Sequence, residues 1–267
     1  MDVLQLAVLA IVQGITEFLP ISSSGHLVLV PLLTDWPDQG LLIDVAVHVG
    51  SLGAVMLYLW RDLRAMLHGA VDWRTSGLMA QPERRLIVLI GVATVPVVVA
   101  GLALSLIGTE GLRRIDVIAW AMIVFGVVLY VVDQRCRSDR KVAEMGVGGA
   151  LLIGCSQILA LIPGTSRAGI TMTAARWLGY ERTEAARFSM LLSIPTIVAA
   201  GALMARELYR LGELAVTEDV LWGAALAFVS AFAAIVVMMR WLRTASFTPF
   251  VVYRVVLGVV LLGVAYR

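Results

Sequence analysis

The sequence predicts an all-α polytopic membrane protein with six transmembrane helices and two re-entrant helix pairs, arranged as an inverted-topology repeat. Of the 267 residues, 60% are hydrophobic and 15% are charged, whereas soluble domains carry about 25% charged residues. One core of this size cannot bury so much apolar surface. Apolar stretches near the length of a membrane crossing recur along the chain, and two further apolar regions are interrupted by polar runs.

Six stretches qualify, or nearly qualify, as membrane spans, because about 20 apolar residues in a helix cross the hydrocarbon layer. They lie at 41–60, 86–107, 117–132, 188–205, 220–239 and 250–265. The apolar regions 3–33 and 147–178 differ, since Pro20 with three serines breaks the first and the run 163–167 breaks the second. Irregular backbone at membrane depth is tolerated only inside protein or beside a wet cavity. We therefore expect two re-entrant pairs, each returning to the side it entered from.

Each broken region is followed by three spans, which divides the chain into repeats at 1–133 and 146–267 with a cytoplasmic connection at 134–145. Lysine and arginine residues in the connections total fourteen on one side and four on the other. The richer side should be cytoplasmic. Because three spans are an odd number, the second repeat is inverted and the two polar tips meet near the midplane. Both termini are then expected outside.

Composition narrows the other possibilities. The net charge of +2 does not indicate a nucleic-acid partner, and the two cysteines lack the spacing of a disulfide framework. The first residues show no cationic region or cleavage site of a signal peptide. A multi-pass protein of the cell membrane is the expectation, and the sequence leaves a homodimer open.

The first break concentrates groups that can carry chemistry. Gln13 and Glu17 are four apart and share a helix face. The returning helix then brings three hydroxyls and an imidazole, from Ser22, Ser23, Ser24 and His26. Ionisable residues at membrane depth are costly and suggest a functional site.

Arg167 is the arginine of the second break. It is always charged, so its burial requires an anionic partner, either Glu17 or a ligand phosphate held by the guanidinium. We favour the phosphate, because Ser166 and Thr171 add hydroxyls in the same loop.

Other polar residues are weaker candidates for the site. Asp44 and His48, four apart in the first span, either face the site or form a packing hydrogen bond. Arg254 either binds a second phosphate or extends its side chain to the membrane–water interface. We favour the interfacial position. Tyr253 is expected in the interfacial aromatic belt.

At these loops the sequence resembles the bacterial undecaprenyl-diphosphate phosphatase family, known for bacitracin resistance. Residues 13–26 are similar to its motif [E/Q]-x-x-x-E-F-L-P-[IV]-S-S-[ST]-G-H, and residues 163–171 to P-G-x-S-R-S-G-x-T. Gln13 stands where many members have glutamate, and Ala168 where many have serine. The resemblance extends over the whole chain.

The resemblance implies hydrolysis of a C55 polyprenyl diphosphate to the monophosphate, which recycles the lipid carrier for peptidoglycan synthesis. It also implies a divalent cation, Mg²⁺ or Ca²⁺, and an active site open to the periplasm. The alternative is a transporter or flippase for the same lipid, because inverted repeats are transporter architecture.

Each site residue then receives an expected role. Arg167, with Ser166 and Thr171, holds the diphosphate, and Ser22 and Ser24 add hydroxyls. Glu17 binds the metal with Gln13 or acts as a base. The nucleophile is Ser23 activated by His26, or a water activated by Glu17 and His26.

Overall fold

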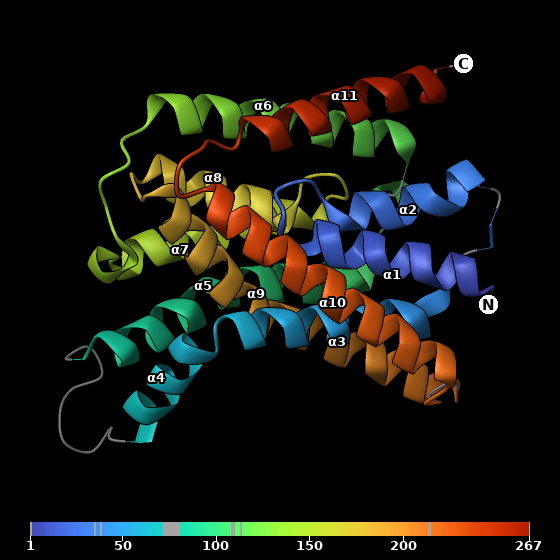
Figure 1. The fold of residues 1–267 in the computed structure, drawn as a ribbon, viewed down its shortest axis with the longest axis horizontal. Helices are drawn as coiled ribbons and strands as arrows, with labels where there is room; N and C mark the ends of the chain where they lie inside the picture. Colours follow the sequence, from blue (N-terminus) through green and yellow to red (C-terminus); the bar gives the residue numbers. More distant parts are fainter. Residues whose placement is uncertain are drawn as a thin grey trace.

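The computed structural model describes residues 2–34, 36–37, 39–71, 81–107, 110–112, 114–212 and 215–266. Eleven α-helices form this part of the chain (Figure 1). They are α1 (Val3–Phe18), α2 (Ser23–Thr34), α3 (Gly40–Tyr58), α4 (Trp60–Val71), α5 (Pro82–Ile107), α6 (Ile115–Arg135), α7 (Val147–Gln157), α8 (Arg167–Trp177), α9 (Arg182–Leu211), α10 (Glu218–Trp241) and α11 (Thr248–Ala265). Three 3₁₀ turns, η1 (Glu110–Leu112), η2 (Val142–Glu144) and η3 (Ile158–Leu161), complete them.

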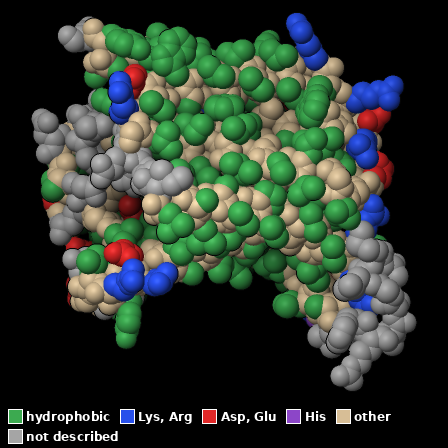
Figure 2. All heavy atoms as spheres, turned by 180° about the vertical axis from the view of Figure 1, so that it is seen from behind, with side chains coloured by type: hydrophobic (Ala, Val, Ile, Leu, Met, Phe, Trp, Pro, Cys, Tyr) green, Lys and Arg blue, Asp and Glu red, His purple; other side chains and the backbone are tan. Residues whose placement is uncertain are grey.

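Six helices in the described ranges are long and apolar enough to cross a membrane, which confirms the predicted spans. They are α3, α5, α6, α9, α10 and α11. Their outward faces carry exposed large apolar side chains, and hydrophobic side chains cover the middle of the molecule in Figure 2. Apolar side chains that face outward fit a hydrocarbon surrounding.

The two broken regions form helix hairpins at opposite ends of the molecule. α1 packs against α2, and α7 packs against α8. In Figure 1 the first hairpin opens towards the end where both termini lie, whereas the second opens towards the end where α4 lies. These helices have 16, 12, 11 and 11 residues, and a full crossing needs about 20. The breaks at 19–22 and 162–166 therefore lie inside the molecule.

The two hairpins share a local geometry at a fixed offset in sequence. Ser22 and Ser166 are the non-glycine residues with positive φ in the described ranges, at 78° and 69°. Each hydroxyl accepts a hydrogen bond from the amide three residues later, of Gly25 and Gly169 respectively. α1 packs on α10 as α7 packs on α5. These parallels support repeats at 1–133 and 146–267, and that division stays a prediction.

A buried ionic cluster fixes the end of α8 that lies away from the tip. Asp133 accepts hydrogen bonds from Arg176 at 2.9 Å and from Arg182 at 2.8 Å. Asp133 and Arg176 are 2% and 1% exposed. A buried pair of this kind is costly to break, because either partner alone would be an uncompensated charge. The cluster ties α6, α8 and α9 together, so the start of α8 at Arg167 is held on a rigid support.

The connection between the first two predicted spans contains a helix, α4. α4 follows α3 almost directly and lies apart from the main bundle in Figure 1. Trp60 is 48% exposed, and Arg61 and Arg64 are also exposed. An exposed tryptophan beside arginines is typical of a helix at a membrane–water boundary.

Candidate active site

Glu17, in the last turn of α1, is the centre of the site, and it is 7% exposed. Its carboxylate accepts hydrogen bonds from Arg167 Nη2 at 2.5 Å, Ser23 Oγ at 2.6 Å and Gln13 Nε2 at 2.8 Å. The predicted residues of both hairpins therefore meet. Glu17 supplies the anionic partner that the buried guanidinium requires.

His48 of α3 also faces Glu17, with Nε2 at 3.9 Å from the carboxylate. Its Nδ1 lies 2.7 Å from the carbonyl oxygen of Asp44. Because a carbonyl only accepts, Nδ1 carries a proton and Nε2 is left to act towards the site. The Asp44 carboxylate itself accepts from Gln39. His48 thus lies beside the site, and Asp44 orients it through the backbone.

His26 points to a partner other than Ser23. Its Nδ1 is 2.7 Å from the Ser22 carbonyl, and its Nε2 is 2.6 Å from the Tyr253 hydroxyl of α11. The two rings are stacked, with centroids 5.6 Å apart. Ser23 instead donates to Glu17. Tyr253, assigned to an interfacial belt from its position in the sequence, is therefore a partner of His26.

The hydroxyls near Arg167 mostly bind protein groups. Ser166 caps α8 by accepting from the Gly169 amide. Thr171 is 1% exposed, donates to the Arg167 carbonyl and lies 2.7 Å from the Ser189 hydroxyl. In this structure Thr171 supports Arg167 and leaves no hydroxyl hydrogen for a phosphate. In the first loop Ser24 is exposed, and its hydroxyl lies 3.4 Å from that of Ser22.

Arg254 lies in the interior, so the expectation of an interfacial side chain is wrong. It is 0% exposed, and all the hydrogen bonds that its guanidinium makes to the described residues go to backbone carbonyls. These belong to Pro20 at 3.3 Å, Ala121 at 3.3 Å, Met122 at 3.2 Å, Gly164 at 3.0 Å and Thr165 at 2.8 Å. Backbone carbonyls can accept all the hydrogen bonds of a buried guanidinium, so Arg254 is accommodated without a carboxylate beside it. Arg254 thus joins the two breaks to each other and to α6.

The predicted metal ligands offer a small set of oxygen atoms. Gln13 donates to Glu17 through its amide nitrogen, while its Oε1 is buried without a hydrogen-bond partner in the described part of the chain. No cluster of three or more His, Cys, Asp or Glu residues suited to a metal occurs there. Mg²⁺ is often held by one or two protein oxygens together with waters and substrate phosphates. Gln13 and Glu17 fit that mode.

Comparison with known proteins agrees with this arrangement. A family model described as bacitracin resistance protein BacA matches residues 6–260. The chain belongs to this family. A protein named undecaprenyl-diphosphatase from Ruegeria sp. (strain TM1040) is 52% identical over 267 residues and covers all of both chains. A protein of the same name from Jannaschia sp. (strain CCS1) is 50% identical, also over the full length of both. The undecaprenyl-diphosphatase 1 of Rhodospirillum rubrum is 49% identical and aligns with the whole of this BacA-family chain and 96% of its own.

Proposed function

We propose that this BacA-family chain hydrolyses undecaprenyl diphosphate to undecaprenyl phosphate and inorganic phosphate, an activity that recycles the lipid carrier for peptidoglycan synthesis and confers bacitracin resistance. Full-length relatives with about half of their residues identical carry the name of this phosphatase. The observation that carries the proposal is the junction of Arg167 with Glu17 and Ser23 between the two hairpins. Phosphoryl transfer needs a cation, a base and an oxygen nucleophile at such a point.

Arg167 changes partner when the lipid binds. In this structure Arg167 forms an ion pair with Glu17 at 2.5 Å. A diphosphate carries more charge than a carboxylate, and two of its oxygens can accept parallel hydrogen bonds from the planar guanidinium. Transfer of Arg167 to the phosphates leaves Glu17 free to accept a proton or bind a cation. A divalent ion on Glu17 and Gln13 would supply charge neutralisation across the diphosphate oxygens.

The Ser23 route follows from the hydrogen bond to Glu17. Ser23 Oγ attacks the terminal phosphorus, its proton passes to Glu17, and the bond between phosphorus and the bridging oxygen breaks. Undecaprenyl phosphate leaves, and water then hydrolyses the phosphoserine. In the alternative, Glu17 takes a proton from a water that attacks phosphorus directly, with His48 Nε2 on the same side.

Replacement of Ser23 by alanine separates these routes. On the serine route the rate of phosphate release should fall by at least about a hundredfold. Ser105→Ala is the control, because that hydroxyl is exposed on α5 and donates only to a backbone carbonyl. A Ser23→Ala protein that keeps most of its rate would eliminate the covalent route and leave the water route.

Phosphate release from purified protein with C55 diphosphate tests the proposal as a whole. We expect release with Mg²⁺ or Ca²⁺ and loss of at least about 90% of it with chelator. Glu17→Gln should move the metal titration to higher concentration, since it removes the only charged oxygen of the pair. An absence of release with either ion would favour lipid transport, for which opposed hairpins are also suited.

We also place the site on the periplasmic side, with both termini outside. The asymmetry of the basic residues supports this orientation, because the connections on the opposite side carry fourteen lysines and arginines and those on the side of the termini carry four. The first hairpin, which holds Glu17 and Ser23, opens towards the end of the molecule where the termini lie (Figure 1).

A further inference from the structure

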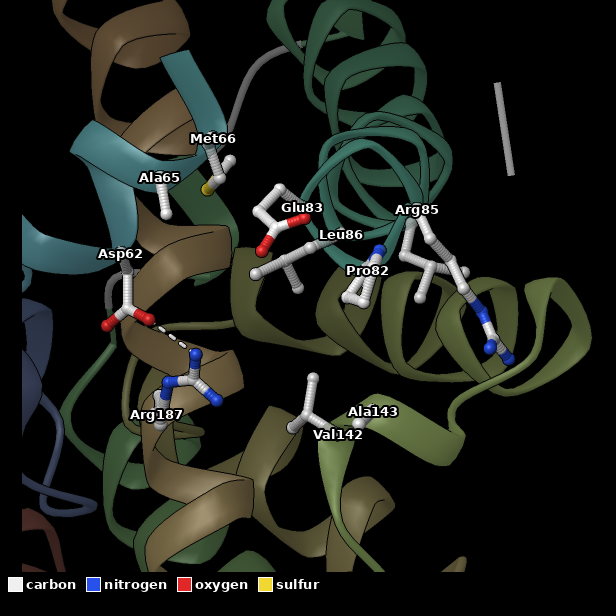
Figure 3. Close-up of a pocket in the computed structure, with 11 residues that line it drawn as sticks. Asp62, Ala65, Met66, Pro82, Glu83, Arg85, Leu86, Val142, Ala143 and Arg187 are labelled. Atoms are coloured by element: carbon white, nitrogen blue, oxygen red, sulfur yellow. Dashed lines mark hydrogen bonds and ion pairs between the residues drawn. The ribbon is translucent and has the colours of Figure 1, made fainter. Parts of the chain in front are cut away.

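A charged cavity lies at the other end of the molecule, beside α4. It has a volume of about 150 Å³ and is formed by α4, the start of α5, η2 and α9 (Figure 3). Its charged residues are Asp62, Glu83, Arg85 and Arg187. None of these belongs to the active site, and the catalytic proposal uses none of them.

The two carboxylates and two guanidiniums around the cavity balance in number, but they do not all pair with one another. Arg187 is paired with Asp62. Arg85 donates to the Met145 carbonyl, and in Figure 3 its guanidinium points away from the other charged groups. The Glu83 carboxylate points towards the space between Asp62 and Arg187, and in the described ranges no hydrogen bond or ion pair involves it. The cavity therefore offers one carboxylate, that of Glu83, without a partner among the described residues, and the Asp62 carboxylate lies nearby.

An apolar groove begins where the cavity ends. Met66 lines both. The groove has a volume of about 510 Å³ and follows α5 and α9 past Ile90, Gly91 and Leu191. Apart from Thr94 its lining is wholly apolar. The charged cavity suits the head group of a lipid, and the apolar groove that continues from it suits an acyl chain.

We propose that the cavity and groove together bind one phospholipid of the phosphatidylethanolamine type, with its primary ammonium on Glu83 beside Asp62 and an acyl chain along α5. A primary ammonium donates up to three charge-assisted hydrogen bonds, which a trimethylated choline head group cannot do. α4, with its exposed Trp60, places the cavity at the depth of lipid head groups. The groove makes the lipid, rather than a free amine, the occupant.

Glu83 also lies in the first turn of α5, where a carboxylate is favoured by the helix dipole alone. The matched control is Glu218→Gln, because Glu218 occupies the first turn of α10 and is exposed away from the cavity. The Glu83→Gln variant removes the charge and preserves the shape. The rate of phosphate release by Glu83→Gln should equal that of the wild type. An unchanged rate shows that the variant is correctly folded.

The experiment measures binding of phosphatidylethanolamine and phosphatidylcholine with identical chains to the delipidated full-length protein, by native mass spectrometry. We expect about tenfold tighter binding of the ethanolamine lipid, from the value of a charge-assisted hydrogen bond. Glu83→Gln should abolish this preference and Glu218→Gln should retain it. Equal binding of the two lipids, or an unchanged preference in Glu83→Gln, would overturn the proposal.

A second variant tests the groove independently of Glu83. A Cβ atom added at Gly91 meets no atom within 4 Å, so the backbone there accepts a side chain, and Gly91→Leu places one in the groove. It should weaken lipid binding about tenfold, since it removes acyl contacts. Gly201→Leu is the control, because Gly201 has equal free space and does not line the groove. Unchanged lipid binding in Gly91→Leu, or free ethanolamine displacing the lipid at equal concentration, would exclude a lipid occupant.

Discussion

Arg167→Ala should lower kcat/KM for undecaprenyl diphosphate about a thousandfold, the scale on which an arginine stabilises phosphoryl transfer. The guanidinium is the cation that the structure brings to Glu17 and Ser23. The same change leaves Glu17 buried without its counter-charge, so unfolding should become easier by about 3 kcal/mol. Phosphate release and thermal unfolding of the same preparation measure both effects.

Two further variants separate catalysis from stability. Arg167→Lys keeps the charge beside Glu17 but loses the planar fork that binds phosphate through two hydrogen bonds. It should unfold at nearly the wild-type temperature and still lose most of the rate. Arg210→Ala is the control. Helix α9 supports Arg167 through the carbonyl of Ser193, and Arg210 is an exposed arginine of the same helix. Its loss should change neither the rate nor the unfolding temperature. A folded Arg167→Ala protein with near-normal turnover would remove Arg167 from the mechanism.

Arg254→Met should reduce kcat about a hundredfold while changing KM less, because it lets the two breaks move relative to each other. Arg254 touches neither Glu17 nor Ser23, but it holds the carbonyls of Pro20, Gly164 and Thr165. A displacement of about 1 Å at a reacting centre can cost a hundredfold in rate. Methionine fills a similar volume without donors, so several buried carbonyls lose their partner.

The measurement is a kcat and KM determination together with thermal unfolding. Arg254→Lys restores the charge and some donors, so it should recover part of kcat. Arg240→Met, at an exposed position of α10, is the control for loss of an arginine. A kcat within twofold of wild type in folded Arg254→Met would show that the breaks keep their geometry without this side chain.

The sequence was a good guide to the membrane spans and to the breaks between them. Hydrocarbon imposes a simple rule of about 20 apolar residues for each crossing, and the six long helices follow it. Pro20 and Pro163 stand in the two breaks, and short polar residues beside them supply the turns. Glu17 could be named in advance as one of two expected partners of Arg167, because each was an unusual charge in an apolar region, although a ligand phosphate was the favoured partner.

The contacts that the sequence did not reveal connect distant segments. Arg254 lies early in the last span, a position that suggests an interfacial side chain, and its acceptors are backbone carbonyls that carry no sequence signal. Tyr253 and His26 are 227 residues apart, and only the packing of α11 brings them together. Thr171 was predicted to bind phosphate because it lies in the same loop sequence as Arg167. Its hydroxyl instead lies beside that of Ser189, which is 18 residues away in the sequence and so gave no local signal.

The position of Arg254 near the carboxyl end has a consequence for biogenesis. Glu17, Ser23 and Arg167 leave the ribosome well before α11 is made, since chains are synthesised from the amino terminus. Until α11 inserts, the carbonyls at both breaks lack the donor that joins them. A truncated or incompletely inserted chain is therefore expected to be inactive even with every reacting group present. We therefore expect activity only after α11 has been completed and inserted.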